Sequence, residues 1–235
     1  MHAVVLAGGR GIRLLEHTQS KPKALIKIGD QAILEHIFYH LQQYDVNKIT
    51  VAGGYEYPIL EKEIHQWSTG SLEIEVVDTG LDANTAGRIR RLKNQIGTES
   101  FLLCWCDALS DLDLNALRGQ HEKSRNLITI AAVNPPSRFG ELLFEADKVV
   151  GYAEKPEQEN RWISGGYFMV NPAVLNHIAD DKSSWEYDVL SPLTQLGQVG
   201  AYRHHGFWQC MDTIHERNQL EEFWQSGNPP WPCQK

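Results

Sequence analysis

The first fourteen residues decide the fold of this 235-residue chain, and they read MHAVVLAGGRGIRL (residues 1–14). The apolar run at residues 3–7 has the length and composition of a buried strand. Glycines follow it at positions 8, 9 and 11. Glycine permits positive φ angles and lets backbone N–H groups approach an anion closely. A strand that ends in such a loop is typical of a phosphate-binding site in an α/β protein.

Two common phosphate loops do not fit this stretch. A Walker loop ends in Gly-Lys-Ser/Thr, and no lysine stands at that place. The dinucleotide fingerprint, started at Gly9, requires glycine or alanine where Leu14 stands. What remains is a glycine loop with Arg13, followed by two lysines around Pro22. Such cations suit a triphosphate and its pyrophosphate leaving group, whereas the plainer interpretation is a tight turn with solvated lysines.

Short apolar runs alternate with amphipathic stretches along the rest of the chain, which predicts a sheet with crossover helices. Further strands are expected at residues 49–52, 74–78, 101–106 and 128–133, and helices at 33–44, 58–67, 86–95 and 114–123. Beyond residue 134 the pattern predicts strands at 141–145, 149–154, 166–170 and 199–203, and helices at 188–196 and 214–224. This indicates one mixed-sheet domain whose β-rich second half folds over the first.

Composition excludes several classes of protein. Lys and Arg number 22 against 30 Asp and Glu, so a net charge of -8 argues against nucleic acid as a partner. Four cysteines are too few for a disulfide scaffold in a chain of this length, and we expect Cys104 and Cys106 to be reduced. No apolar run approaches the roughly 20 residues that span a bilayer, and the first residues lack a basic leader. We therefore expect a soluble, cytoplasmic protein with no membrane partner.

Histidines 36 and 40 stand four residues apart in the helix expected at 33–44, a spacing that can hold a metal. No third ligand is evident near them in the sequence. We therefore expect His36 and His40 to occupy solvated helix positions.

The glycine loop, together with KPK at residues 21–23, resembles the signature of the sugar-phosphate nucleotidylyltransferases. Other segments are similar to those of the glucose-1-phosphate cytidylyltransferases in the same order: VDTG (77–80), TAGR (85–88), RFG (138–140), EKP (154–156), GGYF (165–168) and GFWQCMDT (206–213). The resemblance extends over nearly the whole chain. It implies a Rossmann-like three-layer mixed α/β sheet, the nucleotide-diphospho-sugar transferase fold, in a single domain at 1–235. Residues 1–133 would be its nucleotide-binding half and residues 134–235 its sugar-phosphate-binding half.

The resemblance also implies a reaction in which CTP and a sugar 1-phosphate, glucose 1-phosphate or a related one, form an activated sugar and pyrophosphate. Arg13, Lys23 and Asp107 would be catalytic, with Arg13 favouring the departure of pyrophosphate and Lys23 near the α-phosphate. The implied nucleotide-binding residues are Leu6, Ala7, Gly8, Gly9, Arg10, Gly11, Ile12, Arg13, Lys23, Thr85, Arg88 and Cys106. Taken alone, Arg88 would be interpreted as an exposed cation.

Two aspartates match the family's metal-binding positions, which implies a Mg²⁺ cofactor held by Asp107 and Asp212. Asp107 follows the apolar run 101–106, and ligands of open α/β sheets bind at the carboxyl ends of strands. Asp212 could otherwise cap a helix that begins near residue 214. For the sugar phosphate the resemblance implies Glu154, Lys155, Gly165, Gly166, Trp185 and Glu186. A lone tryptophan is more often part of a core.

Three departures from the family pattern leave alternatives open. Cys106 and Ala108 flank Asp107 where relatives carry glycine, Ile12 replaces a threonine, and the span from Trp67 to Val77 is shorter. One alternative is the same chemistry with another nucleotide or an unusual phosphorylated acceptor. Another is a non-catalytic sensor of nucleotide or sugar phosphate. The partners expected are these small molecules and further copies of the chain in a homo-oligomer.

Overall fold

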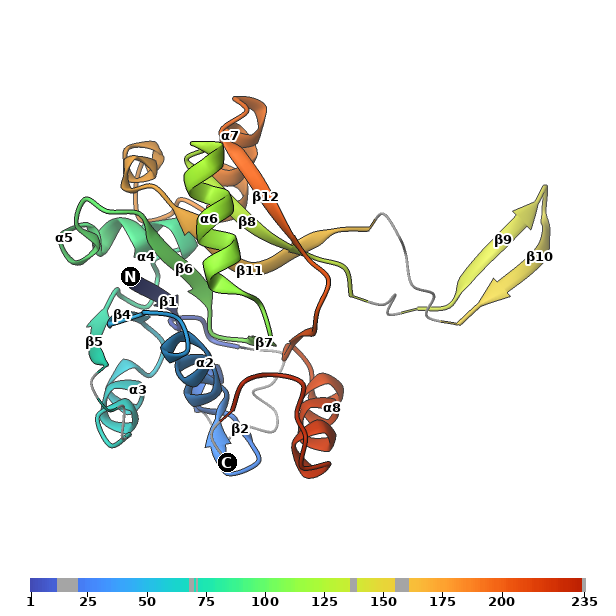
Figure 1. Cartoon of the computed structure of the whole chain (residues 1–235), viewed down its shortest axis with the longest axis horizontal. Helices are drawn as coiled ribbons and strands as arrows, with labels where there is room; N and C mark the ends of the chain where they lie inside the picture. The colour runs from blue at the N-terminus through green and yellow to red at the C-terminus, as the bar shows by residue number, and fades with distance from the viewer. Residues whose placement is uncertain (12–20, 68–69, 71, 136–138, 155–160, 234–235) are drawn as a thin grey trace.

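The structure is a computed structural model that describes residues 1–11, 21–67, 70, 72–135, 139–154 and 161–233 (Figure 1). Seven strands form its large sheet, in the order β12 (Val199–His204), β8 (Ile128–Val133), β11 (Ile163–Val170), β6 (Phe101–Trp105), β1 (His2–Leu6), β4 (Lys48–Gly53) and β5 (Glu73–Asp78). β11 runs antiparallel to β6 and β8, and all other neighbours are parallel. The expected mixed α/β sheet is thereby confirmed.

Helices cover both faces of this sheet. Alternate residues of β1 point to opposite faces, so Ala3 and Val5 belong to one core and Val4 and Leu6 to the other. The first core includes side chains of α2 (Ile33–Gln42), α3 (Tyr57–Ile64), α6 (Leu114–Ser124) and α8 (Ile214–Gln225). The second includes side chains of α4 (Thr85–Arg91), α5 (Lys93–Ile96), η3 (Pro172–His177), η4 (Trp185–Leu190) and α7 (Ser191–Gln195). The result is the expected three-layer arrangement.

Two helices differ from the sequence-based expectation. The helix expected at 86–95 is divided into α4 and α5, with Leu92 between them. The helix expected at 188–196 begins earlier, with the π-helical η4, because the side chain of Ser184 accepts a hydrogen bond from the Tyr187 N–H and caps the segment. The other expected elements agree to within a few residues, which is the usual uncertainty of element ends.

The second half of the chain does not fold over the first, and this expectation was wrong. β11 and β12 enter the same sheet as β1, while β9 (Glu141–Glu145) and β10 (Lys148–Ala153) form a hairpin that extends away from the sheet (Figure 1). Antiparallel pairing places Phe144 opposite Val149, and Leu142 opposite Tyr152. These four side chains are about half exposed or more. Leu143, which alternates with them along β9, is exposed as well, so the hairpin carries exposed apolar side chains on both faces.

Five short segments complete the described part of the fold. They are η2 (Lys23–Leu25), the pair β2 (Lys27–Ile28) with β3 (Gln31–Ala32), and the antiparallel pair β7 (Ala108–Ser110) with β13 (Trp208–Cys210). Among the described residues, no helix has both the length and the apolar character that crossing a membrane requires.

His36 and His40 were expected in solvent and are instead buried in α2. His36 Nε2 lies 3.1 Å from the Ile28 carbonyl oxygen, and His40 Nε2 lies 2.9 Å from that of Leu112. Burial lowers the pKa of both imidazoles. Each therefore acts as a neutral hydrogen-bonding group: His36 ties α2 to β2, and His40 ties it to the loop after β7.

Candidate functional site

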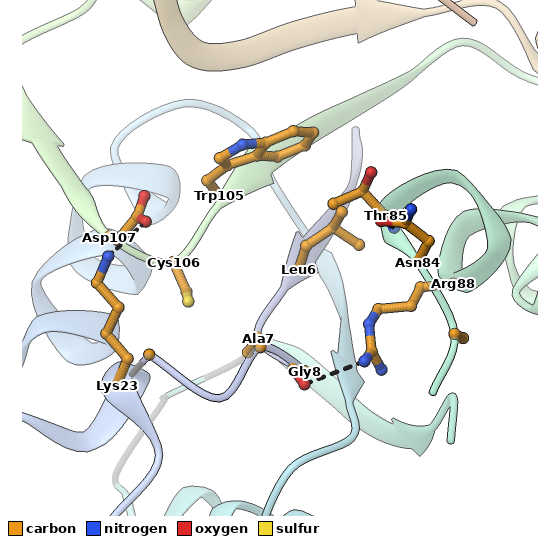
Figure 2. Close-up of a pocket in the computed structure, with 13 residues that line it drawn as sticks. Leu6, Ala7, Gly8, Lys23, Asn84, Thr85, Arg88, Trp105, Cys106 and Asp107 are labelled. Carbon is orange, nitrogen blue, oxygen red and sulfur yellow. Dashed lines mark hydrogen bonds and ion pairs between the residues drawn. The ribbon is translucent and has the colours of Figure 1, made fainter. Parts of the chain in front are cut away.

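A pocket of about 300 Å³ opens at the carboxyl ends of β1 and β6, beside the first turn of α4 (Figure 2). This is the edge at which ligands bind in open parallel sheets. Its lining comprises Leu6, Ala7, Gly8, Gly9, Gly11, Lys23, Ala83, Asn84, Thr85, Arg88, Trp105, Cys106 and Asp107. Ten of these were expected from the sequence to bind nucleotide or act in catalysis. The exposed Arg10 stands next to them in the chain, whereas Ile12 and Arg13 lie outside the described residues.

Sequence reasoning missed three residues of the lining: Ala83, Asn84 and Trp105. Asn84 caps α4, since its side-chain oxygen accepts a hydrogen bond from the Thr85 N–H at 2.8 Å. An asparagine directly before the TAGR segment is a cap signal that could have identified it. Trp105 ends β6 two residues before Asp107 and had no such signal.

The glycine loop is anchored at its start and packed against Lys23 at its end. The Ala7 N–H donates to the Ala52 carbonyl at 3.0 Å, and the Tyr55 N–H donates to the Gly8 carbonyl at 3.1 Å. Gly11 has a φ of +56°, and a Cβ there would lie 3.0 Å from the Cβ of Lys23. A side chain at Gly11 would therefore be strained and would press on Lys23.

Arg88 is buried, with only 6% of its surface exposed, so its interpretation as an exposed cation was wrong. Its guanidinium donates to the carbonyl oxygens of Gly8, Gly53, Gly80 and Leu81 at 2.7–3.2 Å, and to Thr79 Oγ1 at 2.8 Å. Burial lowers the pKa of this group. Arg88 thus joins the ends of β1 and β4 to the loop before α4 and shapes the pocket from beneath (Figure 2).

We expect Gly8→Ala to weaken both folding and nucleotide binding. A Cβ on Gly8 would overlap the Arg88 guanidinium, which its hydrogen bonds hold in place. Overpacking of this kind costs about 1–3 kcal/mol. Denaturant unfolding and nucleotide titration measure the two effects. Gly9→Ala is the matched control, because no atom lies within 4 Å of a Cβ at Gly9. Equal behaviour of the two variants would contradict this account of the loop.

Asp107 and Asp212, the two aspartates expected to share a metal ion, converge on one side chain, that of Lys23. The ammonium of Lys23 donates to Asp107 Oδ2 at 2.7 Å and to Asp212 Oδ1 at 2.6 Å. Only 12% of the Lys23 side chain is exposed. Burial alone would lower the pKa of Lys23, but the charge of Asp107 and the two hydrogen bonds outweigh it and raise the pKa above its usual value.

The convergence follows from pairing between distant segments. In the β7–β13 ladder Cys210 lies opposite Ala108, and the Met211 N–H donates to the Asp107 carbonyl at 2.7 Å. The two aspartates therefore stand on adjacent backbone segments although more than a hundred residues separate them. Asp107 directly precedes β7, and Asp212 follows β13 by two residues.

Asp212 is not the cap of α8, which was the alternative interpretation of its sequence. Thr213 is the cap, and its hydroxyl accepts a hydrogen bond from the Glu216 N–H. The Glu216 carboxylate in turn accepts the N–H of Asp212 at 2.7 Å and that of Thr213 at 2.9 Å. Glu216 thereby fixes the backbone of Asp212, a role that sequence reasoning missed. The Thr-x-x-Glu spacing of a capping box was the available signal.

The two carboxylates fit a divalent cation. One oxygen of each carboxylate already contacts the same positive charge, the Lys23 ammonium. Within the described part of the chain, no three His, Cys, Asp or Glu side chains gather in a metal-binding cluster. Two carboxylates completed by phosphate and water oxygens are a usual environment for Mg²⁺ bound with a nucleotide.

Cys106 carries a neutral thiol beside Asp107. Burial raises its pKa to about 12, so the thiolate required of a nucleophile or a metal ligand does not form near neutral pH. Cys104 and Cys106 are free thiols, as expected, and so are Cys210 and Cys233. Cys106 therefore contributes volume to the pocket wall.

The residues expected at the sugar phosphate are only partly gathered. Gly165 and Gly166 face two tryptophans: Trp208 Nε1 donates to the Gly165 carbonyl at 2.8 Å, and a Cβ on Gly166 would lie 3.5 Å from that of Trp105. Glu154 follows the projecting hairpin and accepts a hydrogen bond from the Tyr152 hydroxyl. Lys155 lies outside the described residues.

Glu186 and Trp185 are adjacent in the chain but have different surroundings. Glu186 is exposed and accepts a hydrogen bond from the Thr85 hydroxyl at 3.3 Å, which places it beside the pocket. Trp185 is fully buried and packs edge-on against Phe168 in the second core. The interpretation of Trp185 as a wall of the sugar site was wrong, because its ring is covered by the core.

Residues 2–210 match the sequence family described as Nucleotidyl transferase. The chain is 34% identical to the glucose-1-phosphate cytidylyltransferase of Salmonella typhi over 98% of both chains. It is 32% identical to the probable glucose-1-phosphate cytidylyltransferase of Bacillus subtilis, over 98% of this chain and 99% of that one.

Solved structures share the fold at lower identity. HddC from Yersinia pseudotuberculosis superposes with a TM-score of 0.77 at 20% identity, over 95% of this chain and 99% of that one. The UTP-bound UGPase from Acinetobacter baumannii gives 0.74 at 15% identity, over 98% and 95%. These likenesses confirm the Rossmann-like fold. With a family match over most of its length and relatives that align nearly end to end, this chain belongs to the nucleotidyl transferase family.

Proposed function

We propose that the protein transfers the cytidylyl group of CTP to glucose 1-phosphate or a related sugar 1-phosphate and releases pyrophosphate. One observation carries the chemistry: Asp107 and Asp212 meet at Lys23 beside a glycine-lined pocket. The choice of substrates is supported by the 34% identity to a relative named for CTP transfer to glucose 1-phosphate. We take residues 1–235 as one domain. Residues 1–133 would bind the nucleotide, and residues 134–235 would bind the sugar phosphate.

The nucleotide would bind with its phosphates on the glycine loop. Backbone N–H groups of Gly8 to Gly11 would hold phosphate oxygens, and Lys23 lies close enough to the loop to add a charged donor. The side chains of Leu6, Trp105 and Thr85 line the same pocket and would contact the rest of the nucleotide. Arg10 and Arg13 would add positive charge beyond the loop, and Ile12 would contribute its backbone.

The chemical step would be an in-line attack by a phosphate oxygen of the sugar 1-phosphate on the α-phosphorus of CTP. The new P–O bond forms as the bond to the bridging oxygen of pyrophosphate breaks, so the step requires positioning and charge neutralisation. Lys23 would donate to the α-phosphate as its charge grows, and Arg13 would favour the departure of pyrophosphate. Asp107 and Asp212 would hold Mg²⁺, which when bound neutralises phosphate charge.

The sugar phosphate would lie on the opposite side of β6 from the glycine loop. Gly165 and Gly166 are buried, with Gly166 packed against Trp105, and they would contribute backbone atoms to this part of the site. Glu186 would accept hydrogen bonds from sugar hydroxyls. Glu154 and Lys155 would reach the sugar phosphate from the segment after β10. The product would be an activated sugar of the kind that polysaccharide synthesis consumes.

The proposed setting is the cytoplasm, where nucleotide and sugar phosphate are available, and the proposed assembly is a homo-oligomer. The exposed apolar side chains of the β9–β10 hairpin support association between copies, because isolated two-stranded hairpins are only marginally stable in water.

A substrate matrix tests the proposal. The full chain is incubated with CTP, UTP, GTP or dTTP and a panel of sugar 1-phosphates, with Mg²⁺ or with EDTA, and pyrophosphate is measured. We expect release from CTP with glucose 1-phosphate or a close relative of it, and only with Mg²⁺. Release with another nucleotide would assign the same chemistry to other substrates. Tight binding of a nucleotide without release from any pair would favour the sensor, for which Cys106 and Ala108 beside Asp107 are the motivating residues.

A further inference from the structure

The Lys23 ammonium occupies the position at which a cation would contact both carboxylates. We propose that Lys23 is an internal counter-ion that keeps free divalent cations out of the Asp107–Asp212 pair and leaves it when a nucleoside triphosphate binds. The second half of this inference rests on the proposed function, because it requires a triphosphate in the pocket. The first half concerns the protein alone.

The geometry makes the ammonium and a metal ion mutually exclusive. Lys23 Nζ lies 2.7 Å from Asp107 Oδ2 and 2.6 Å from Asp212 Oδ1. A Mg²⁺ ion bound to the same two oxygens would sit about 2.0–2.1 Å from each of them. The nitrogen and the metal would then occupy the same space between the carboxylates. Entry of the metal requires that the ammonium move.

A free metal ion provides no new hydrogen-bond acceptor for the ammonium that it displaces. The side chain of Lys23 is 12% exposed, and a largely buried charge that loses its partner is strongly destabilised. The free ion would also gain only two protein carboxylates, since the described residues contain no cluster of three ligating side chains. Displacement of the Lys23 ammonium and incomplete coordination of the metal both oppose binding of the free ion.

A triphosphate removes both obstacles at once. Its oxygens would accept the hydrogen bonds that Lys23 gives up, and they would complete the coordination of the metal. Lys23 lines the same pocket as the glycine loop, with its Cβ next to Gly11, so a change of side-chain rotamer suffices to turn the ammonium toward phosphates held there. The flexible four-carbon stem of lysine permits such a movement. Metal would thus enter together with nucleotide.

The test measures Mn²⁺ binding to the full chain without nucleotide, using the electron paramagnetic resonance signal of the free ion. We expect wild-type protein to bind Mn²⁺ weakly, with a dissociation constant in the millimolar range. Lys23→Met removes the ammonium and keeps most of the stem, and we expect its affinity to rise at least about ten-fold. Lys27→Met is the matched control, because it removes the same charge from an exposed lysine four residues away. It should change the affinity less than about two-fold.

Several results would overturn the proposal. Micromolar binding of Mn²⁺ to the wild type would show that Lys23 does not block the site, and this result needs no variant. An unchanged affinity of Lys23→Met, or an equal gain in Lys27→Met, would show that the ammonium does not compete locally. Circular dichroism checks that Lys23→Met is folded. If it is not, the wild-type titration and the Lys23→Arg variant test the proposal instead. Lys23→Arg should bind Mn²⁺ as weakly as the wild type.

The release by triphosphate has a separate readout. With CTP added, the wild type should give the enhanced water-proton relaxation of a protein-bound Mn²⁺–nucleotide complex, whereas Mn²⁺ alone should not. None of these measurements depends on transfer. A protein that excludes free Mn²⁺ through Lys23 but releases no pyrophosphate would therefore refute the proposed function and leave the counter-ion role standing. An active protein that binds free Mn²⁺ tightly would support the proposed function and refute the counter-ion role.

Discussion

Asp107→Asn should lower the rate of pyrophosphate release by about 10²- to 10³-fold, the effect of losing one preorganised charge contact to a transition state. The amide keeps the size of the side chain but loses the negative charge that binds a divalent cation. Lys23 retains Asp212 as its partner at 2.6 Å, so the substitution leaves no unpaired buried ammonium. We therefore expect the fold to persist. Steady-state release of pyrophosphate from CTP and glucose 1-phosphate measures the loss.

Asp147→Asn is the matched control for this experiment. It makes the same change of charge in the turn of the β9–β10 hairpin, which extends away from the large sheet and contributes no residue to the lining of the pocket. Its rate should equal that of the wild type. Normal turnover by Asp107→Asn, with its circular dichroism unchanged, would remove the metal role of this carboxylate and with it the proposed mechanism.

Arg88→Met should lower the free energy of unfolding by about 3 kcal/mol or more, because the break-up of a buried hydrogen-bond network is among the few causes of large losses. The guanidinium donates to four backbone carbonyls and to the Thr79 hydroxyl, and Met donates to none of them. A buried acceptor that loses its donor costs about 1–3 kcal/mol. Nucleotide affinity should fall too, because Gly8 loses a contact that holds the loop. Denaturant unfolding and nucleotide titration measure these losses.

Arg91→Met provides the comparison from the same helix. Arg91 forms an ion pair with Asp181 at 2.6 Å, but its side chain is 42% exposed, and surface ion pairs contribute little. Its substitution should change stability far less than that of Arg88. The stability of Arg88→Lys should be close to that of Arg88→Met, because one ammonium cannot reach all the acceptors that the planar guanidinium contacts. Equal stability of the Arg88→Met and Arg91→Met proteins would contradict the bracing role.

Features that depend on residues close together in the chain were predictable from the sequence. The first strand and its glycine loop follow from an apolar run that meets glycines, and Asp107 follows from its place after an apolar run. Arg88, Trp185 and the histidines of α2 were misjudged for a shared reason. Each is polar or amphipathic, and its burial depends on segments that pack against it from elsewhere in the chain, which local pattern does not reveal.

The amino-acid sequence by itself determined the alternation of strands and helices, the glycine loop after the first strand and the family to which the chain belongs. These properties depend on residues close together in the chain or on the order of motifs along it. Only the tertiary structure decided that Lys23 lies between Asp107 and Asp212, that Arg88 braces the pocket and that the β9–β10 hairpin projects from the sheet. Lys23 and Asp212 are 189 residues apart, and only the pairing of β7 with β13 places Asp212 next to Asp107.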